Sequence, residues 1–491
     1  MTHTESNHHL FINGTWTDGS GHERLDVINP ATEAVIATVP QATLEDLQTA
    51  VEAARRAFDS GPWPTMRPAD RARIMLRMGE IMQRRRSELV ELNIAEAGSI
   101  RSLAEAHQTD VPILYWNDIS ERVMGSYRFI EPLLPAVREG KNGSIGQGVV
   151  RREPVGVAAL ITPYNFPFML NTCKLAPALA TGCTVVMKPS PDTPLSALIL
   201  GEIAEEAGLP EGVLNIITGD VAVSETLTTH PMVDLVSFTG SDAVGRQVYA
   251  QAARSLKRVV LELGGKSANL IFDDADLDRA AASIVDGFTV HAGQGCALLT
   301  RTLVQESVHD ELLARVRALA ASVKVGDPAD SGTTMGPLIS ARQRERVEQH
   351  IQAGLDAGAS LVLGGGRPPV SRGFFVEPTL FAGVNNSMPL VREEIFGPVG
   401  VIGTFTTDDE AVALANDSEY GLSGGVWSQN TARAYAVAAR IRTGTTFING
   451  GGGLSPYAPF GGYKNSGLGV ERGEYGLDEY VQLKHVSWAV R

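Results

Sequence analysis

Short apolar runs, each followed by a polar or glycine-rich turn, constrain the fold of this chain more than any other feature. Within residues 155–265 they are VGVAALI, CTVVMKP, VLNIITG, VDLVSFTG and VVLELGG. Helical stretches, such as residues 194–208 and 242–254, separate them. Short β-rich runs that alternate with helices predict βαβ units and a parallel sheet covered on both faces. Because such sheets bind ligands beyond the carboxyl ends of their strands, we expect a small-molecule site there.

The flanking regions predict further helices and strands. Upstream, Thr43 with the acidic residues Glu45 and Asp46 is typical of a helix N-cap and first turn, and Asp70 begins a second, longer helix. A second α/β region is expected over 266–460, with helices near 276–291, 309–322, 340–357 and 430–441 and a strand over 399–405. The C-terminal EYVQLKHVSWAV is rich in β-forming residues. A strand at a chain end must pair with something, and another subunit is one candidate.

Composition excludes several classes of protein. The 491 residues suffice for two to four domains at roughly 100–200 residues each. The net charge of −14 argues against nucleic acid or an anionic membrane as a partner. We find no apolar run of the roughly 18 residues that span a bilayer and no signal peptide. Cys173, Cys183 and Cys296 are too few for a disulfide framework or a cysteine metal site, so we expect a reducing cytoplasm and no metal.

Candidate chemical groups stand near the strand ends, although each also has an ordinary structural explanation. Cys296 lies in the small-residue segment GQGCA, where its sulfur can be reached, but most cysteines are buried and inert. Glu262 precedes a glycine pair and is either a base or a solvated turn residue. Asn165 is either an amide donor or a structural turn residue. The turn from Gly240 to Gly245 either holds a phosphate at a helix N-terminus or is a plain connection.

Short motifs in a fixed order favour a functional role for these candidate residues. The segments are LFINGTW, TPYNFP, KPS, SFTGS, LELGGK, GQGC, MGPLI, EEIFGP and PFGGYKNSGLG, and 34 residues separate Glu262 from Cys296. On these motifs the chain resembles the NAD(P)-dependent aldehyde dehydrogenase superfamily over nearly its whole length. The resemblance implies an α/β fold with a Rossmann-like cofactor domain, an α/β catalytic domain and a small β oligomerisation arm. The implied ranges are 1–129 and 151–264 for the cofactor domain, 265–462 for the catalytic domain, and 130–150 and 463–491 for the arm.

The resemblance implies a covalent mechanism. Cys296 would be the nucleophile, Glu262 the general base, and Asn165 the oxyanion donor together with the Cys296 backbone amide. Thiolate addition to an aldehyde gives a thiohemiacetal oxyanion that can expel hydride to the cofactor. The resulting thioester needs a water activated by a carboxylate, and no metal is required.

The implied cofactor is NAD, with NADP as an alternative. Lys188 would contact the adenosine ribose, the turn at Gly240 the pyrophosphate, and Glu394 the nicotinamide ribose. The full implied set is Ile161, Thr162, Pro163, Tyr164, Lys188, Ser190, Gly219, Phe238, Gly240, Ser241, Val244, Leu263, Glu394 and Phe396. The implied assembly is a homodimer or a homotetramer.

The implied substrate channel predicts an uncharged aldehyde. Its residues would be Leu170, Cys173, Gly295, Leu454 and Phe460. All are apolar or small, and none is an arginine or lysine that could bind a carboxylate. An aliphatic, terpenoid or aromatic aldehyde is therefore favoured over a semialdehyde acid.

The chain departs from the common family pattern at a few positions. Pro191 stands where many NAD-using relatives have a glutamate that binds both adenosine ribose hydroxyls, which weakens a strict NAD preference. Tyr164 replaces a frequent tryptophan, and Val470 replaces a usual arginine. His291 replaces a usual asparagine, and we have no mechanistic account of it.

Two alternative functions remain open at this point. A CoA-acylating member would pass the acyl group to a thiol and would need no hydrolytic base, so Glu262 argues against it. A catalytically silent structural protein of the same fold would have no need of Cys296, Glu262 and Asn165 together. NADH formation from a panel of aldehydes, with and without CoA, separates all three.

Overall fold

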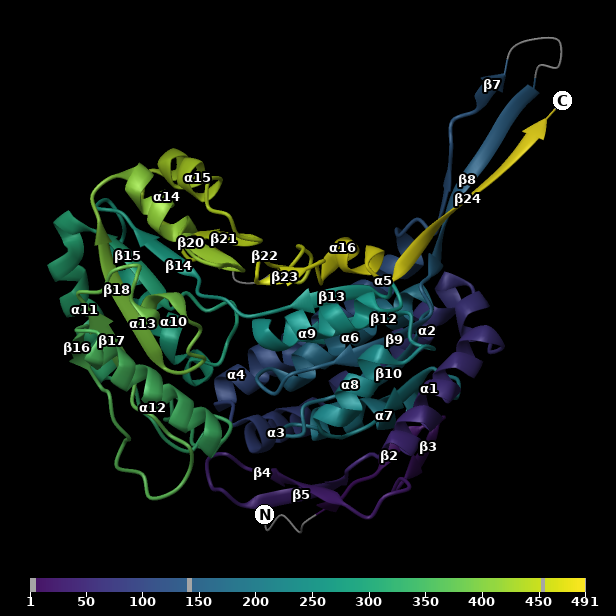
Figure 1. Ribbon diagram of the computed structural model, residues 1–491, viewed down its shortest axis with the longest axis horizontal. Coiled ribbons are helices and arrows are strands. Elements are labelled where there is room, and N and C mark those ends of the chain that lie inside the picture. The colour runs from purple at the N-terminus through teal and green to yellow at the C-terminus, as the bar shows by residue number, and fades with distance from the viewer. Residues whose placement is uncertain (1–5, 139–143, 452–454, 491) are drawn as a thin grey trace.

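The computed structural model describes residues 6–138, 144–451 and 455–490 and is built around two large sheets (Figure 1). The larger sheet has eight strands in the order β23-β13-β12-β9-β10-β11-β2-β3. Their bounds are β2 Leu10–Ile12, β3 Thr15–Thr17, β9 Val157–Ile161, β10 Thr184–Lys188, β11 Leu214–Ile216, β12 Leu235–Thr239, β13 Arg258–Glu262 and β23 Gly467–Leu468. β9 to β13 pair in parallel, whereas β2 and β23 join antiparallel at the two sides. The predicted parallel sheet and the α/β class are confirmed.

Helices cover both faces of this sheet because its central strands are buried throughout. These helices are α1 Leu44–Asp59, α2 Pro68–Arg84, α3 Arg86–Ala97, α4 Arg101–Glu105, α5 Val111–Gly125, α6 Pro167–Thr181, α7 Leu195–Ala207, α8 Val221–Thr229 and α9 Asp242–Ala253. Thr43 caps α1 in a reciprocal capping box with Asp46, as the sequence predicts. The longer helix begins at Pro68, slightly before the predicted Asp70, because proline is well suited to the first helical turn.

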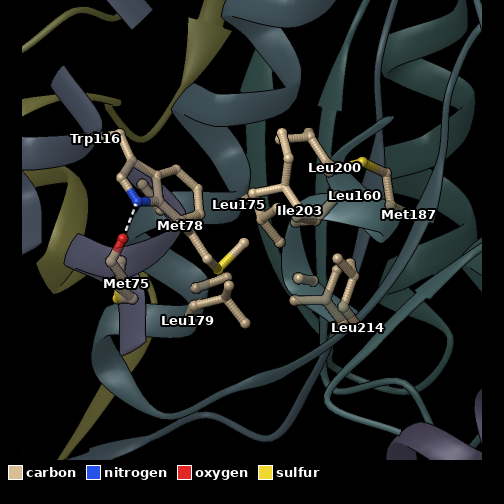
Figure 2. Packing of buried hydrophobic residues seen from close by; sticks show 14 of the residues in the cluster. Met75, Met78, Trp116, Leu160, Leu175, Leu179, Met187, Leu200, Ile203 and Leu214 are labelled. Carbon is tan, nitrogen blue, oxygen red and sulfur yellow. Dashed lines mark hydrogen bonds between the residues drawn. The ribbon is translucent and has the colours of Figure 1, made fainter. Parts of the chain in front are cut away.

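A continuous apolar core joins these helices to the sheet (Figure 2). Met75 and Met78 of α2 pack with Trp116 of α5 and Leu175 of α6, and all four are completely buried. The Trp116 indole N–H donates to the Met75 carbonyl at 2.7 Å, so the one polar atom of this large side chain is satisfied. This packing fixes α6 and the strands beside it.

The second sheet has seven strands in the order β16-β17-β18-β15-β14-β20-β21. The strands are β14 Ala268–Ile271, β15 Arg301–Gln305, β16 Ser360–Leu363, β17 Thr379–Ala382, β18 Val399–Phe405, β20 Ser423–Trp427 and β21 Thr445–Ile448. Its helices are α10 Leu277–Thr289, α11 His309–Ala321, α12 Ala341–Asp356, α13 Pro389–Arg392, α14 Asp408–Asn416 and α15 Thr431–Ala438. The predicted strand 399–405 agrees with β18 at both ends.

A four-stranded arm projects from the body of the molecule and carries the C-terminus (Figure 1). Its strands are β6 Ile130–Pro132, β7 Ala136–Arg138, β8 Ser144–Pro154 and β24 Val481–Val490. β24 runs antiparallel to β8, from Val481 opposite Pro154 to Val490 opposite Ile145. The C-terminal strand therefore has its partner within the chain, and it forms one edge of the arm sheet.

Part of the segment predicted for the arm belongs instead to the cofactor-domain region. β23 pairs with β13, and α16 (Gly473–Asp478) packs against α5 and α6. The reason is burial, because Leu477 and Tyr480 lie in the core of the larger sheet. Of the predicted range 463–491, β24 joins the arm sheet. The other domain boundaries stay predictions.

Small strands complete the fold. Near the N-terminus, β1 Ser6–Asn7, β4 Arg24–Ile28 and β5 Val35–Pro40 form a three-stranded sheet, and β19 Tyr420–Gly421 pairs with β22 Tyr463–Lys464. Within the described ranges, no helix has the length and apolar character needed to cross a membrane. Those ranges also contain no cluster of three or more His, Cys, Asp or Glu arranged to hold a metal ion.

Candidate active site

Neighbouring strands of the larger sheet end at one edge and carry the candidate residues there. The register pairs Ile161 of β9 with Lys188 of β10, and Phe238 of β12 with Ile161. On the next strand, Glu262 of β13 lies opposite Thr239 of β12. Because all these strands are parallel, their carboxyl ends meet at the edge where α/β sheets bind ligands.

Glu262 is a buried carboxyl group at the end of β13. It is 2% exposed, and neither carboxylate oxygen has a hydrogen-bond partner among the described residues. Burial raises the pKa of Glu262 well above its usual range, and the Glu471 carboxylate raises it further. Two nearby cations, Lys174 and Arg472, act in the opposite direction. A buried carboxyl with free oxygens and a raised pKa is typical of an acid–base group.

Cys296 lies in the loop after the short helix η3 (Val290–Gly293). Gly293 has a φ of 73°, and a Cβ there would overlap a neighbouring backbone carbonyl, so this turn requires glycine. A Cβ on Gly265 would lie 2.5 Å from the carbonyl oxygen of Cys296. The loop that carries Cys296 therefore packs directly on the turn that follows Glu262.

The three cysteines differ in exposure. Cys173 and Cys183 are buried, whereas Cys296 is partly exposed. Burial of the sulfur raises the pKa of Cys296 to about 12, with further increases from Glu394 and Glu262. The site in this state therefore holds a thiol, which must lose its proton before it can attack a carbonyl carbon.

Hydrogen bonds tie Asn165 to the cysteine loop. Its side-chain Nδ2 donates to the Gln294 carbonyl at 2.9 Å, and its backbone carbonyl accepts from Gln108 Nε2 at 3.0 Å. Gln294 Nε2 donates in turn to the carbonyls of His291 and Pro337 at 3.0 and 3.3 Å. The bond to Gln294 uses one N–H of the Asn165 amide, so the second N–H can serve an oxyanion.

His291 packs beneath this loop. Its φ is 50°, and its ring centroid lies 5.2 Å from that of Phe166. Burial lowers the pKa of His291 to about 4, against an opposing contribution from the backbone of Asn165. The ring is therefore neutral at physiological pH, and it adds no charge to the site.

The turn after β12 has the geometry of a phosphate site. Ser241 is the N-cap of α9, and its Oγ accepts the Val244 N–H at 3.4 Å. The Gly240 N–H donates a hydrogen bond of 3.1 Å to the backbone carbonyl of Glu262, the last residue of β13. A Cβ at Gly245 would overlap Leu263, so α9 approaches the β13 turn closely. Since helix N-termini favour anions, the residues present fit the pyrophosphate of a dinucleotide.

A lysine ends β10, and a carboxylate follows in the next turn. Lys188 is 5% exposed. Burial lowers its pKa to about 8, and the carboxylates of Asp220 and Asp192 act in the opposite direction. The Asp192 N–H donates to Ser190 Oγ at 3.3 Å, which fixes this turn just after the exposed Pro191. Sequence reasoning considered Pro191 and missed Asp192.

The residues implied for the nicotinamide ribose lie between two turns. Glu394 Oε1 accepts the Gly265 N–H at 3.0 Å, and burial raises the pKa of Glu394 to about 7. Phe396 has a φ of 57° and makes an edge contact with Tyr164, with ring centroids 6.0 Å apart. The remaining implied cofactor residues follow the same edge: Thr162 and Pro163 after β9, and Gly219 after β11.

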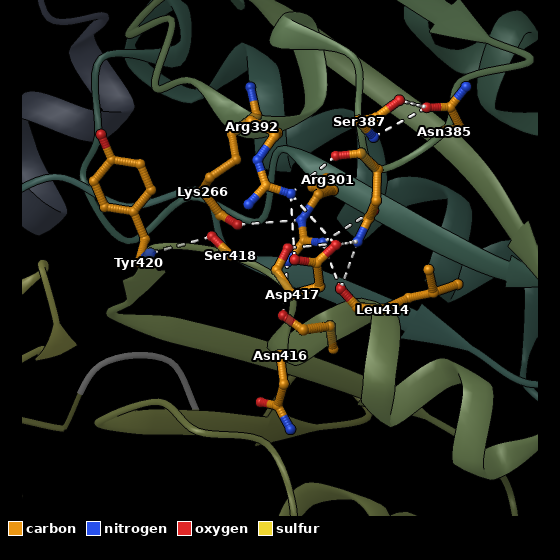
Figure 3. Close-up of polar contacts among 12 residues, drawn as sticks. Lys266, Arg301, Asn385, Ser387, Arg392, Leu414, Asn416, Asp417, Ser418 and Tyr420 are labelled. Carbon is orange, nitrogen blue, oxygen red and sulfur yellow. Dashed lines mark hydrogen bonds and ion pairs between the residues drawn. The ribbon is translucent and has the colours of Figure 1, made fainter.

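The Arg301 side chain connects the turn at Lys266 with the end of α14 (Figure 3). Its guanidinium is buried and donates to the carbonyls of Leu414 and Ala415 at 2.8 Å each, and to that of Lys266 at 3.4 Å. A buried guanidinium that satisfies several carbonyls locks the loops that carry them. Lys266 directly follows Gly265, on which Cys296 packs, so this network supports the loop that carries Cys296.

The residues implied for substrate binding are only partly described. Leu454 lies outside the described residues. Leu170 and Cys173 are buried on α6, Gly295 directly precedes Cys296, and Phe460 is buried.

Sequence reasoning missed buried charges beside these residues. Lys174 and Glu471 form an ion pair of 2.6 Å in which both side chains are almost fully buried. The Arg472 guanidinium carbon lies 4.8 Å from the centroid of the Phe460 ring. A lysine within the apolar sequence of α6 was the signal that could have revealed the ion pair. No comparable sequence signal marks Arg472. This residue is not among the implied substrate residues from which an uncharged aldehyde is expected.

Comparison with known proteins decides the family. The profile of the aldehyde dehydrogenase family matches residues 16–486. The chain belongs to the aldehyde dehydrogenase family. The resemblance found in its motifs is thereby confirmed, and so is the fold that the resemblance implies.

Individual aldehyde dehydrogenases match over nearly their whole length. Betaine aldehyde dehydrogenase of Bacillus subtilis is 40% identical, with 97% of this chain and 96% of that protein covered. Geranial dehydrogenase of Castellaniella defragrans is 40% identical, with 98% and 99% covered. Among solved structures, an aldehyde dehydrogenase of Mycobacterium tuberculosis complexed with NAD⁺ has a TM-score of 0.93, 42% identity and 98% of both chains covered. These aldehyde dehydrogenases differ in the charge of the substrates in their names, so family membership leaves the substrate of this chain open.

Proposed function

We propose that this chain oxidises an aldehyde to the carboxylic acid with NAD⁺, through a thioester on Cys296 that water hydrolyses. The observation that carries this proposal is the Glu262 carboxyl group. It is buried and free of hydrogen bonds within the described residues, and it ends the strand whose following turn packs on the Cys296 loop. A CoA-acylating enzyme has no need of such a group.

The residues of the site divide the reaction between them. The Cys296 thiolate attacks the aldehyde carbon, and the free N–H of Asn165 with the Cys296 backbone amide stabilises the thiohemiacetal oxyanion. One such donor typically contributes about 2.7–4 kcal/mol. NAD⁺, when bound, would supply the acceptor for the hydride that leaves the thiohemiacetal. Glu262, once deprotonated, then removes a proton from the water that attacks the thioester carbon.

The NAD assignment is supported by the edge of the sheet. The α9 N-terminus at Ser241 suits the pyrophosphate, and Lys188, buried at the end of β10, is the residue that we expect to contact the adenosine ribose. Solved relatives, including the Mycobacterium tuberculosis enzyme, are complexed with NAD⁺.

The cofactor preference gives a first testable prediction. We expect NAD to be preferred, because Asp192 beside Lys188 repels a 2′-phosphate. We also expect measurable use of NADP, because Pro191 cannot bind the ribose hydroxyls. Kinetic comparison of kcat/KM for the two cofactors tests this. P191E should increase the ratio of NAD to NADP efficiency, whereas a tenfold preference of the wild type for NADP, about 1.4 kcal/mol, would contradict the assignment.

An aldehyde panel tests the function as a whole. Wild-type protein is mixed with NAD and aliphatic, aromatic, cationic or anionic aldehydes, and NADH absorbance is followed with and without CoA. We expect continuous NADH formation without CoA from at least one aldehyde. NADH formation that requires CoA would assign the acylating function. No NADH or NADPH formation from any aldehyde with either cofactor would leave a structural role.

We further propose that the chain works as a homodimer or homotetramer in a reducing cytoplasm. The arm supports the assembly, because β24 is an edge strand that exposes Leu483, Val486 and Trp488 by 40% or more. The compartment is supported by the three free cysteines, one of them partly exposed.

Changing the exposed face of β24 tests the assembly. In the double variant V486K/W488K, two charges replace apolar side chains on one face of the strand, and the monomer fold is unaffected because both are partly exposed. We expect light scattering to show a species of about half the wild-type mass or less. L256K, at a residue 93% exposed in the turn before β13, is the matched control and should keep the wild-type mass. An unchanged mass in V486K/W488K would refute the role of the arm.

A further inference from the structure

Arg472 is a buried cation that no carboxylate of the described residues pairs with. The residue is 4% exposed, and among the described residues it forms no ion pair. Its backbone has a φ of 71° and immediately precedes α16. A non-glycine residue in this conformation is held by its surroundings, and such positions gather at functional sites.

The backbone places Arg472 beside the implied substrate residues. Glu471, its neighbour in the chain, forms a β-bridge with Phe460. The guanidinium then lies over the Phe460 ring, with its central carbon 4.8 Å from the centroid, a distance at which a cation is attracted to the aromatic face. Arg472 also interacts with Cys173. Burial raises the pKa of that thiol to about 11, and Arg472 lowers it through its charge and a hydrogen bond.

The charge of Arg472 also reaches the catalytic groups. It lowers the pKa of Cys296, which burial raises, and it does the same for Glu262. The buried cation therefore acts electrostatically on both Cys296 and Glu262.

Neighbouring acidic groups do not supply the missing counter-charge. The Glu471 carboxylate forms an ion pair of 2.6 Å with Lys174. The Lys174 ammonium group also donates a hydrogen bond to Ser237 at 2.9 Å. Neither Glu262 oxygen has a hydrogen-bond partner among the described residues, so this carboxyl group makes no direct contact with the Arg472 guanidinium. One positive charge thus remains beside the substrate residues, and a buried charge without a partner is unfavourable.

We propose that Arg472 selects aldehydes that carry a carboxylate and rejects aldehydes that carry a cation. This proposal rests on the proposed function, because it places Arg472 at the substrate of that same site. A carboxylate fits the guanidinium in a planar, two-point hydrogen-bonded pair and supplies the missing counter-charge. A substrate with an ammonium group would bring a second positive charge beside the first. The substrate class inferred here is therefore a semialdehyde acid, in contrast to the uncharged aldehyde expected from the lining residues alone.

The charge of the aldehyde is the variable in the test. Three probes of similar length are compared with NAD present: 4-oxobutanoate, butanal and 3-aminopropanal. For wild-type protein we expect kcat/KM to fall in that order, with 4-oxobutanoate at least tenfold above butanal. Butanal equal to or better than 4-oxobutanoate, or the aminoaldehyde as the best probe, would overturn the proposal. This comparison needs no variant, so it holds even if a substitution at Arg472 impairs folding.

Variants then attribute the preference to Arg472. In R472Q the ratio of kcat/KM for 4-oxobutanoate to that for butanal should fall at least tenfold, mainly through a higher KM for the anion. R472K keeps the charge and should retain part of that ratio. R442Q removes an exposed arginine and controls for the change in net charge. An equal loss for both probes in R472Q would show a structural or thiolate-stabilising role and would refute selection.

Failure of the proposed function looks different from failure of this inference. If none of the probes yields NADH, the proposed function itself fails. If butanal is oxidised steadily and charge has no effect on kcat/KM, the function stands and the role of Arg472 is refuted.

Discussion

Replacing Cys296 with alanine should abolish aldehyde oxidation and leave NAD binding nearly intact. Cys296 is the partly exposed one of the three cysteines, and without its sulfur no covalent intermediate can form. Loss of a catalytic nucleophile lowers kcat on the order of 10⁶-fold in other covalent enzymes. NADH absorbance measures the rate, and calorimetric titration with NAD measures binding.

The matched control for C296A is C183A. Cys183 is buried near Tyr480 in the core of the larger sheet, away from the catalytic loop. Removing its sulfur should cost about 1 kcal/mol of stability and leave turnover in place. C173A should also retain turnover. NADH formation by C296A at a near wild-type rate would mean that another group performs the attack.

E262Q should convert steady turnover into a single burst of NADH. Glutamine keeps the size of the side chain but cannot accept the proton of a water, so hydride transfer proceeds and hydrolysis stalls. General bases typically contribute 10²–10⁴-fold, and we expect the steady rate after the burst to fall by about that factor. Stopped-flow absorbance resolves the burst, whose amplitude should equal the number of active sites.

Two other outcomes of the E262Q experiment would assign different roles. If the burst itself is slow, Glu262 serves mainly to remove the proton from Cys296, whose pKa is raised to about 12 by burial. If E262Q turns over at the wild-type rate, Glu262 is not the base. In both cases the proposed division of labour would be incorrect.

The central fold could be predicted because each strand of the larger sheet is short, apolar and followed by a turn. β9, β10 and β12 are buried at every position, and such strands are distinct in sequence from amphipathic helices. The same reasoning could not find β23, which has two residues, or assign it to β13 across 205 residues of sequence. It also could not tell that Leu477 and Tyr480 belong to the core, because their burial depends on long-range packing.

The candidate site residues could be predicted from the sequence where they lie at or just after the end of a strand. Glu262 and Lys188 end their strands, and Asn165 follows closely after β9, so topology alone brings them together. Arg472 was not predictable in this way. Its position depends on a β-bridge to Phe460 and on a left-handed φ, neither of which has a sequence signature. The roles of all these residues stay predictions until the variants are measured.

Intact-protein mass spectrometry of E262Q tests the central claim most directly. The variant is mixed with NAD and butanal, quenched after the burst and weighed, and C296A/E262Q is treated in the same way. The account predicts a mass increase equal to that of butanal less two hydrogen atoms, which is the mass of a thioester, and no increase when Cys296 is absent. An unmodified mass after a full burst of NADH, or an adduct that persists in C296A/E262Q, would contradict it.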